Sequence, residues 1–290
     1  MMMFCLMARN LKVFFRDRMA VFFSFLSVII TIGMYVLFLG NMMERNVGPV
    51  AGARFVADSW IMAGLLAMVS ITSTMGAYGI MVEDRTKKIL RDFRAAPLPR
   101  TALVGGYVFA ALMIGLALSL TTFVLGQLYI VAYGGEFLSP PSVLKVLAIM
   151  VVTVVSSSAM MIFVVSLFDS NNAYSAAASV IGALIGFLTG IYIPLGALPT
   201  GVQYVVKFFP PSHGAALFRQ VMMEEAMVKA FANAPTAAVA EFKHGFGVIF
   251  DYGSFTADVA THIAFLLGSA LVFFALATWN LSRKGGGHVS

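Results

Sequence analysis

The chain has 290 residues, of which 60% are hydrophobic and 11% are charged, and its formal net charge is +6. A soluble domain carries about 45–50% apolar and about 25% charged residues, so this composition excludes a soluble globular protein and indicates several membrane spans. The single cysteine excludes an intrachain disulfide and a cysteine-rich metal site. The lysines and arginines cluster between hydrophobic segments, where they typically set the orientation of a membrane protein. This placement does not indicate nucleic-acid binding.

The first feature in chain order is an amphipathic segment, residues 1–18. Phe4 and Phe14 fall on an apolar stripe at helical spacing, while Arg9 and Lys12 lie elsewhere on the helical wheel. This pattern predicts a helix that lies at the membrane surface. The alternative is that the segment is only a positively charged flank of the first span.

Hydrophobic segments follow that are free of Asp, Glu, Lys and Arg and long enough to cross a bilayer, which takes about 20 apolar residues. They are residues 19–43, 59–82, 101–135, 146–168, 170–206 and 259–282. They predict an all-α integral membrane protein with six transmembrane helices in a single domain, residues 1–290.

The second hydrophobic segment carries hydroxyl side chains at steps of three and four. They are Ser70, Ser73 and Thr74. Such hydroxyls either line a cavity for a substrate or bond the carbonyls of their own helix or of a neighbour. The pattern leaves both interpretations open.

A charged segment, residues 83–100, joins the second and third hydrophobic segments. It surrounds Ile89, Leu90 and Phe93 with acids and bases, and Pro97 ends any helix there. It is either a short helix that docks on a cytosolic partner or a charged loop that only sets the topology.

Small residues recur at every fourth position of the fifth hydrophobic segment. They are Ala178, Gly182, Gly186 and Gly190. Such a stripe predicts close helix packing, either within one subunit or near a two-fold axis where two copies meet beside a pathway. Three bulky neighbours are then candidates for an apolar constriction: Phe187, Leu188 and Ile191.

The region from 194 to 258 is too broken by proline for a full crossing. Pro194 and Pro199 predict that the fifth helix crosses to about residue 193 and then turns. Ser212 is a candidate N-cap for a helix that follows it. The region is either a re-entrant hairpin with surface helices or an ordinary external loop with one helix.

Lysine and arginine are densest before the first span, between spans two and three, and after span six. The positive-inside rule therefore predicts a multi-pass protein of the cell membrane with both termini in the cytoplasm.

Several motifs are missing from the sequence. No acid or base falls at mid-depth of a predicted span, which disfavours an ion-coupled carrier. No phosphate-loop motif occurs, and neither do the His-Glu-x-x-His and Gly-x-Ser-x-Gly motifs of proteases and hydrolases. We therefore expect no catalytic, cofactor-binding or metal-binding residue, and energy for uphill transport would enter through a partner.

Three stretches, in this order, carry a resemblance to a known family. They are "ARNLKVFFRDRMAVFFSFLSVIITIGMYVLFLG", "MVEDRTKKILRDFRAAPLPRTALVGGYV" and "GIYIPLGALPTGVQYVVKFFPPSHGAALFRQVM". Together they resemble the membrane-spanning permease subunits of ABC exporters, in the six-span class that exports drugs, polysaccharides or lipids. The resemblance covers nearly the whole chain except residues 233–258.

The resemblance implies a pair of permease subunits, identical or different, each docked on a separate cytosolic ATPase that binds ATP and magnesium. Spans two and five then flank the pathway for a hydrophobic or amphipathic substrate, with Phe187 at an outer gate. The N-terminal helix would be a second contact with the ATPase. The loop between spans two and three would supply the coupling residues, which are Glu83, Asp84, Arg85, Lys87, Lys88, Arg91 and Arg94.

The alternative is a membrane protein of another class. It would be an ATP-independent channel or carrier, or a membrane anchor for an assembly.

Overall fold

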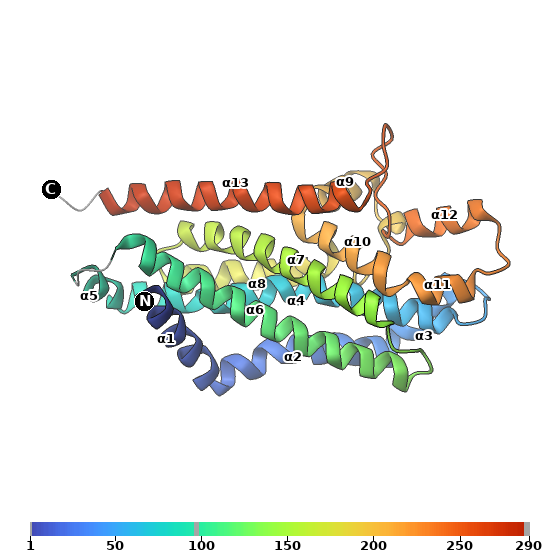
Figure 1. Cartoon of the computed structure of the whole chain (residues 1–290), viewed down its shortest axis with the longest axis horizontal. Coiled ribbons are helices and arrows are strands. Elements are labelled where there is room, and N and C mark those ends of the chain that lie inside the picture. The colour runs from blue at the N-terminus through green and yellow to red at the C-terminus, as the bar shows by residue number, and fades with distance from the viewer. Residues whose placement is uncertain (1, 96–98, 287–290) are drawn as a thin grey trace.

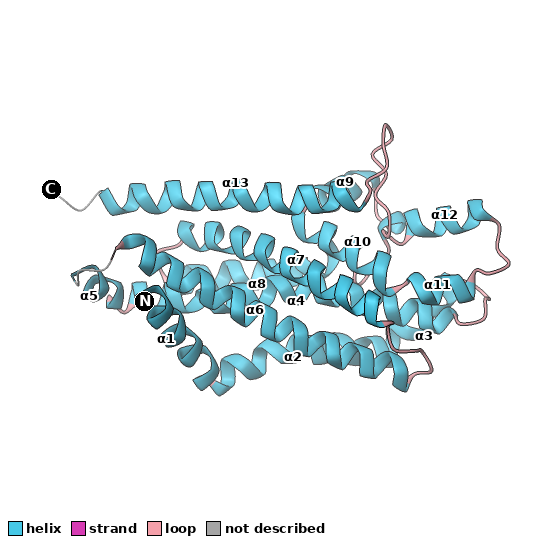
Figure 2. Cartoon of the chain, in the orientation of Figure 1, coloured by secondary structure: helices cyan, strands magenta, loops and turns pink. Residues whose placement is uncertain are grey.

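The computed structural model describes residues 2–95 and 99–286, and this part of the chain is built from helices (Figure 2). Within it no strand occurs, and residues Asp251 and Thr256 form an isolated antiparallel bridge. The predicted all-α membrane fold is confirmed.

Five helices are long and apolar enough to cross a membrane. In chain order they are α4 (Ala53–Thr86), α6 (Arg100–Ala132), α7 (Pro140–Leu167), α8 (Asn171–Leu188) and α13 (Val259–Gly286). They fall on the second to sixth predicted segments, because an apolar run in lipid has to satisfy its backbone hydrogen bonds internally.

The first predicted span is carried by α2 (Arg18–Met34), which continues through the π turn η1 (Tyr35–Leu39) into α3 (Gly40–Val47). Before it, α1 (Met2–Arg16) slants away from the bundle axis (Figure 1). The segments Met2–Arg16 and Val21–Leu37 are bent by 73°, and counting this pair as one crossing gives six spans.

The two ends of the bundle are built from different elements (Figure 1). At one end lie α1, the short helix α5 (Ile89–Ala95) and the C-terminal part of α13; we call this the α5 end. At the other lie α3 and the short helices α11 (Glu224–Ala230) and α12 (Thr236–Gly245); we call this the α12 end.

The centre of the molecule is α4, which packs against α6, α7, α8 and α10. In the most hydrophobic part of α4, 89% of the residues are buried, whereas the buried share is 17% for α8 and for α13. Small residues tighten the core: a Cβ on Gly115 would lie 2.8 Å from Val154 Cγ1 and 3.0 Å from Thr74 Cγ2. Close packing of this kind holds membrane helices together where no hydrophobic drive exists between them.

The region after α8 folds into short helices. Besides α11 and α12 they are the 3₁₀ turn η2 (Leu195–Ala197), α9 (Thr200–Phe208) and α10 (Pro210–Met222). The fifth span is shorter than predicted: α8 ends at Leu188, and Gly190 adopts a left-handed φ of 67°. The chain therefore turns before it reaches Pro194, and glycine makes that turn without strain.

The predicted N-cap role of Ser212 is wrong. Pro210 and Pro211 occupy the first positions of α10, because their fixed φ suits the first turn of a helix. The helix therefore starts before Ser212, and the Ser212 hydroxyl donates instead to the carbonyl of Leu188 at 2.6 Å.

Candidate functional site

At the α5 end, Asp84 of α4 is buried and bonded to two other helices. Arg9 of α1 donates to both carboxylate oxygens, one at 2.9 Å, and the Tyr107 hydroxyl of α6 donates at 2.6 Å. The Arg9 guanidinium also lies 5.7 Å from the ring centroid of Phe93 in α5. The hydrogen bond to Asp84 raises the pKa of Arg9. We call these four residues the Asp84 junction, which ties α1, α4, α5 and α6 together.

Arg85 follows directly and is also bound within the chain. Its guanidinium donates to the carbonyl of Phe168 and lies 3.3 Å from a carboxylate oxygen of Asp169. Arg85 therefore fastens the end of α4 to the connection between α7 and α8.

Among the predicted coupling residues whose side chains are described, Glu83, Lys87 and Lys88 are exposed. Glu83 and Lys87 pair at 2.5 Å across one helical turn, and Lys88 adopts a left-handed φ of 65° that turns the chain into α5. The backbones of Arg91 and Arg94 belong to α5, but their side chains lie outside the described residues.

The predicted pathway hydroxyls on α4 are buried. Ser70 donates to Leu66 O at 2.9 Å, Ser73 to Val69 O at 2.5 Å, and Thr74 to Ile71 O at 2.9 Å. Each hydroxyl is bonded to its own helix, at the packed seam between α4 and its neighbours. This geometry favours the packing interpretation of the hydroxyl pattern.

A buried arginine holds the turn that follows α8. Arg219 of α10 donates from Nη2 to the carbonyls of Thr189 and Gly190, both at 2.9 Å. Its guanidinium lies 4.8 Å from the ring centroid of Trp60 in α4. Burial lowers the pKa of Arg219 to about 9, so the side chain stays charged at neutral pH. The carbonyls at the negative end of α8 offset that charge.

The predicted constriction residues lie on both sides of this turn. Ile191 is fully buried, and a Cβ on Gly64 of α4 would lie 2.9 Å from its Cγ1. Phe187 is 46% exposed and packs edge-on against Tyr192 at 5.2 Å between ring centroids. Leu188 is half-buried. The structure therefore does not gather the three side chains around one opening within a single chain.

The glycine stripe of α8 divides into two parts. Ala178 is half-buried, and a Cβ on Gly182 would meet no atom within 4 Å. A Cβ on Gly186 would instead lie 2.2 Å from the Tyr192 ring, and Gly190 forms the left-handed turn. Gly186 and Gly190 therefore serve the fold of one chain, and the open side of α8 lies at Gly182.

The α12 end of α4 carries a second buried carboxylate. Arg54 Nε lies 3.0 Å from Asp58 Oδ1, and Arg54 Nη2 donates to the Tyr129 hydroxyl of α6 at 3.1 Å. The Arg54 guanidinium also lies 5.5 Å from the Tyr35 ring and 5.1 Å from the Tyr133 ring. Aromatic faces attract such a cation, so this cluster joins the first three spans.

Two histidines meet where α10 and α13 begin. The Nδ1 atoms of His213 and His262 are 2.8 Å apart, and His213 Nε2 lies 2.8 Å from the carbonyl of Lys207. Burial lowers the pKa of His213 to about 4, which keeps the ring neutral. Because the carbonyl can only accept, His213 carries its proton on Nε2 and His262 donates from Nδ1.

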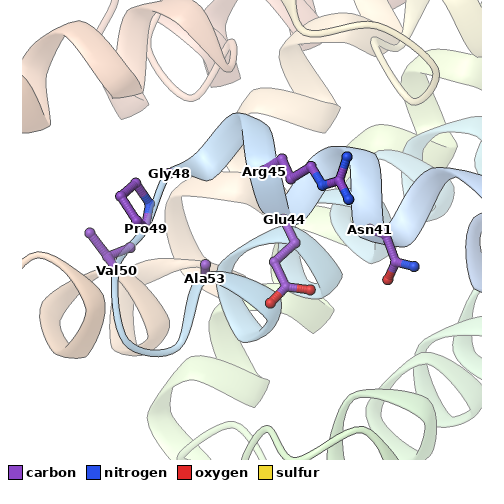
Figure 3. Close-up of a pocket in the computed structure, with 7 residues that line it drawn as sticks. All are labelled: Asn41, Glu44, Arg45, Gly48, Pro49, Val50 and Ala53. Atoms are coloured by element: carbon purple, nitrogen blue, oxygen red, sulfur yellow. The ribbon is translucent and has the colours of Figure 1, made fainter.

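A shallow cavity of about 520 Å³ lies between α3 and the start of α4 (Figure 3). Its lining residues are Asn41, Glu44, Arg45, Gly48, Pro49, Val50 and Ala53. Figure 3 shows Asn41 and Glu44 leaving α3 on the same side. Its polar side chains are all at least partly exposed, so it is not a built binding site. Among the described residues, no group of three or more metal-ligating side chains is close enough to hold an ion.

A profile of the family described as "ABC-2 family transporter protein" matches residues 51–279, which is well over half of the chain. The chain belongs to this family. A search of curated proteins finds no match.

Membership in the ABC-2 family makes the chain a membrane transport subunit, a permease, and implies association with an ABC ATPase. The match begins just before α4 and ends near the end of α13. It therefore includes Arg54 and Asp58, the charged segment, Arg219 and the histidine pair, whereas α1 and Tyr35 lie outside it.

Several of these contacts were missed in the sequence because their partners are far apart along the chain. Arg9 and Asp84 are 75 residues apart, and Arg219 bonds residues about 30 positions away. His262 has His213 as its partner, 49 positions earlier in the chain. The pair of Arg54 and Asp58, four positions apart at a helix start, is the exception that spacing alone would have indicated.

Proposed function

We propose that this ABC-2 permease belongs to an ATP-driven exporter and forms the pathway for a hydrophobic or amphipathic substrate. Its α5 end and both termini would face the cytoplasm, where a separate ATPase docks. ATP and magnesium would bind to that partner chain, and residues 1–290 would act as one permease domain.

The observation that carries this proposal is the position of the exposed charged segment. Glu83, Lys87 and Lys88 are at the end of α4 and just before α5, and α5 lies at the same end of the bundle as α1 (Figure 1). They are exposed and adjoin the buried Asp84 in the chain. A partner that moves α5 therefore moves α4 through the continuous chain, α1 through Arg9 and α6 through Tyr107. The exposed residues would dock the ATPase, and Asp84 and Arg85 would transmit its motion.

The proposed cargo rests on the charges of the spanning helices. The charged residues of α4 lie near its two ends, and α13 carries none before Arg283. A charged cargo crossing the bilayer core would need compensating groups along its path.

Two permease subunits would pair, and α8 is a candidate for the shared face. A Cβ on Gly182 would meet no atom within 4 Å, and on the opposite face of the helix Val180 and Leu184 are 60% and 52% exposed. The substitution Gly182→Leu tests the pairing, because it leaves the contacts within one chain intact. Loss of dimer by crosslinking in membranes, with an unchanged melting temperature of the chain, is the expected result. An unchanged dimer would remove the Gly182 side of α8 from the interface.

The central experiment is co-purification of the ATPase with the double variant Lys87→Glu, Lys88→Glu. Reversing these exposed charges should reduce the bound ATPase by about tenfold, because each lost charge pair at a docking surface weakens binding. The control is Lys229→Glu, Lys243→Glu at the α12 end. Equal retention of the ATPase by both double variants would contradict the proposed docking site.

Transport by the purified chain without nucleotide would favour a channel or carrier.

A further inference from the structure

A second cavity of about 520 Å³ lies at the α12 end, between η2, α9, α12 and the turn before α13. Seven polar side chains line it: Gln203, Tyr204, Lys207, Glu241, His244, Asp251 and Tyr252. Neither the proposed pathway nor the proposed docking site uses these residues. They come in part from residues 233–258, the segment that the family resemblance leaves unassigned.

The walls of this cavity are held by specific contacts. A Cβ on Gly196 would lie 2.9 Å from the Cα of Gly245, so η2 and α12 touch through their backbones. Lys207 Nζ donates to the carbonyl of Asp251 at 2.5 Å, and the Tyr252 hydroxyl donates to the carbonyl of Lys207 at 3.0 Å. The cavity is therefore part of the fold rather than a gap between loose loops.

The polar groups of the cavity select the chemistry of a ligand. Lys207 offers a positive charge, while Glu241 and Asp251 offer negative ones. His244 borders the cavity with a buried Nδ1 that has no hydrogen-bond partner in the described part of the chain. An anion would meet the two carboxylates, and a cation would meet Lys207. A hydroxyl group suits all of them, because it both donates and accepts.

Aromatic rings complete this lining. The Lys207 ammonium lies 5.8 Å from the ring centroids of both Tyr204 and Tyr252, so the two rings flank the donor. Flat apolar faces beside donors and acceptors suit a ring that carries C–H groups on its faces and hydroxyls on its edge.

The other side of α9 is apolar and exposed. Val202, Val205 and Phe208 are 42%, 59% and 62% exposed at helical spacing. A helix with one polar and one apolar face lies in the membrane interface. The cavity therefore borders the membrane surface, where the acyl chains of a bound lipid can follow the apolar side of α9.

We propose that this cavity binds the neutral, hydroxyl-rich headgroup of a lipid, with the acyl chains of that lipid in the bilayer. The site belongs to this chain alone, so it stands or falls separately from the ATPase partner and from the direction of transport.

The test is native mass spectrometry of the full chain, purified in a detergent without a sugar headgroup and titrated with lipids that share the same acyl chains. The probes are monoglucosyl diacylglycerol, phosphatidylcholine, phosphatidic acid and a trimethylammonium lipid. We expect one saturable copy of the glucosyl lipid, bound about tenfold more tightly than the other three, since a few additional hydrogen bonds to charged groups give that factor.

Two single variants, Glu241→Gln and Lys207→Gln, should each weaken binding of the glucosyl lipid by about tenfold. The matched controls are Glu224→Gln and Lys229→Gln, which lie outside the cavity. Glu241 is exposed, so its variant keeps the fold and the result is interpretable even if Lys207→Gln melts early. Equal or tighter binding of any charged or zwitterionic lipid would overturn the proposal, as would glucosyl-lipid binding that both cavity variants retain.

Discussion

The two ends of α4 use the same chemistry for different purposes. At each end a buried aspartate pairs with an arginine, and a tyrosine of α6 reaches the pair: Tyr107 at Asp84 and Tyr129 at Asp58. Arg54 is one helical turn from Asp58, so that pair is local. Arg9 comes from α1, 75 residues before Asp84.

The difference shows which end can transmit motion between segments. The Arg54–Asp58 pair forms within α4 alone, and Tyr129 of α6 adds a hydrogen bond to it. The Asp84 junction exists only when α1 and α6 are in place, so moving any of its helices strains the others. At the α5 end of α4, the salt bridge therefore couples α4 to a separate segment, α1. This is the end that we propose for ATPase docking.

Arg9→Met should have the largest effect on stability of the variants that test this comparison. It leaves the Asp84 carboxyl group 4% exposed, with the Tyr107 hydroxyl as a donor and no cation beside it. Removing one partner of a fully buried pair costs about 3–5 kcal/mol. Because the Arg9 side chain is 32% exposed, we expect a smaller loss of about 2–3 kcal/mol in the unfolding free energy. Unfolding by denaturant in detergent measures it, with Arg45→Met as the exposed control. A loss no larger than that of the control would mean that Asp84 needs no arginine.

Asp58→Asn should have a smaller effect at the other end. The amide keeps an acceptor for Arg54, and the guanidinium keeps its contacts with Tyr35 and Tyr133. We expect a loss of about 1–2 kcal/mol, because the amide keeps part of a hydrogen bond to a charged group, which in full contributes about 1.5–3 kcal/mol. Unfolding by denaturant in detergent also measures this loss. If Asp58→Asn costs more than Arg9→Met, the ranking of the two ends is wrong.

The variants Tyr107→Phe and Tyr129→Phe compare the loss of one tyrosine hydroxyl at each end of α4. Tyr107 donates to Asp84 at 2.6 Å, whereas the Tyr129 hydroxyl is 3.4 Å from Asp58. We expect about 1 kcal/mol for Tyr107→Phe and about half of that for Tyr129→Phe. Parallel melting of both variants tests the order, and each is the control for the other.

Lys88→Gly should give the smallest change, and it should stabilise the fold. Lys88 has a left-handed φ of 65°, which costs a residue with a Cβ about 1 kcal/mol. Glycine relieves that strain but adds flexibility to the unfolded chain, so the net gain should be about 0.5 kcal/mol. Lys87→Gly, in the preceding helical cap, is the comparison and should destabilise. A loss of stability in Lys88→Gly would show that its side chain contributes a contact.

The fold was largely predictable because hydrophobic runs in a bilayer have few alternatives to helix. For the charged segment around Leu90 and Phe93 the sequence left a short helix and a loop open, and the structure forms the helix α5 there. The end of α8 was misplaced because proline was taken as the terminator, whereas Gly190 had already turned the chain. At Ser212 the two preceding prolines started the helix, so the hydroxyl was used elsewhere.

The candidate sites were less predictable because residue type does not reveal what a side chain is bonded to. Asp84 and Lys87 looked alike as charges in one short segment, yet Asp84 is buried and Lys87 is exposed. Arg219 looked like one scattered base of a surface region, and the structure buries it against carbonyls from two other segments. Pairing across the fold depends on tertiary packing, which a single sequence does not display.

The reach of Arg9 along the chain also sets an order of events during synthesis. Chains emerge from the ribosome N-terminal end first, so α1 is made long before Asp84 exists, and Tyr107 comes later still. The pair of Arg54 and Asp58 can form as soon as α4 inserts. The helix α1 must therefore wait without its carboxylate partner, and the α5 end of the molecule closes only after the third hydrophobic segment has begun to appear.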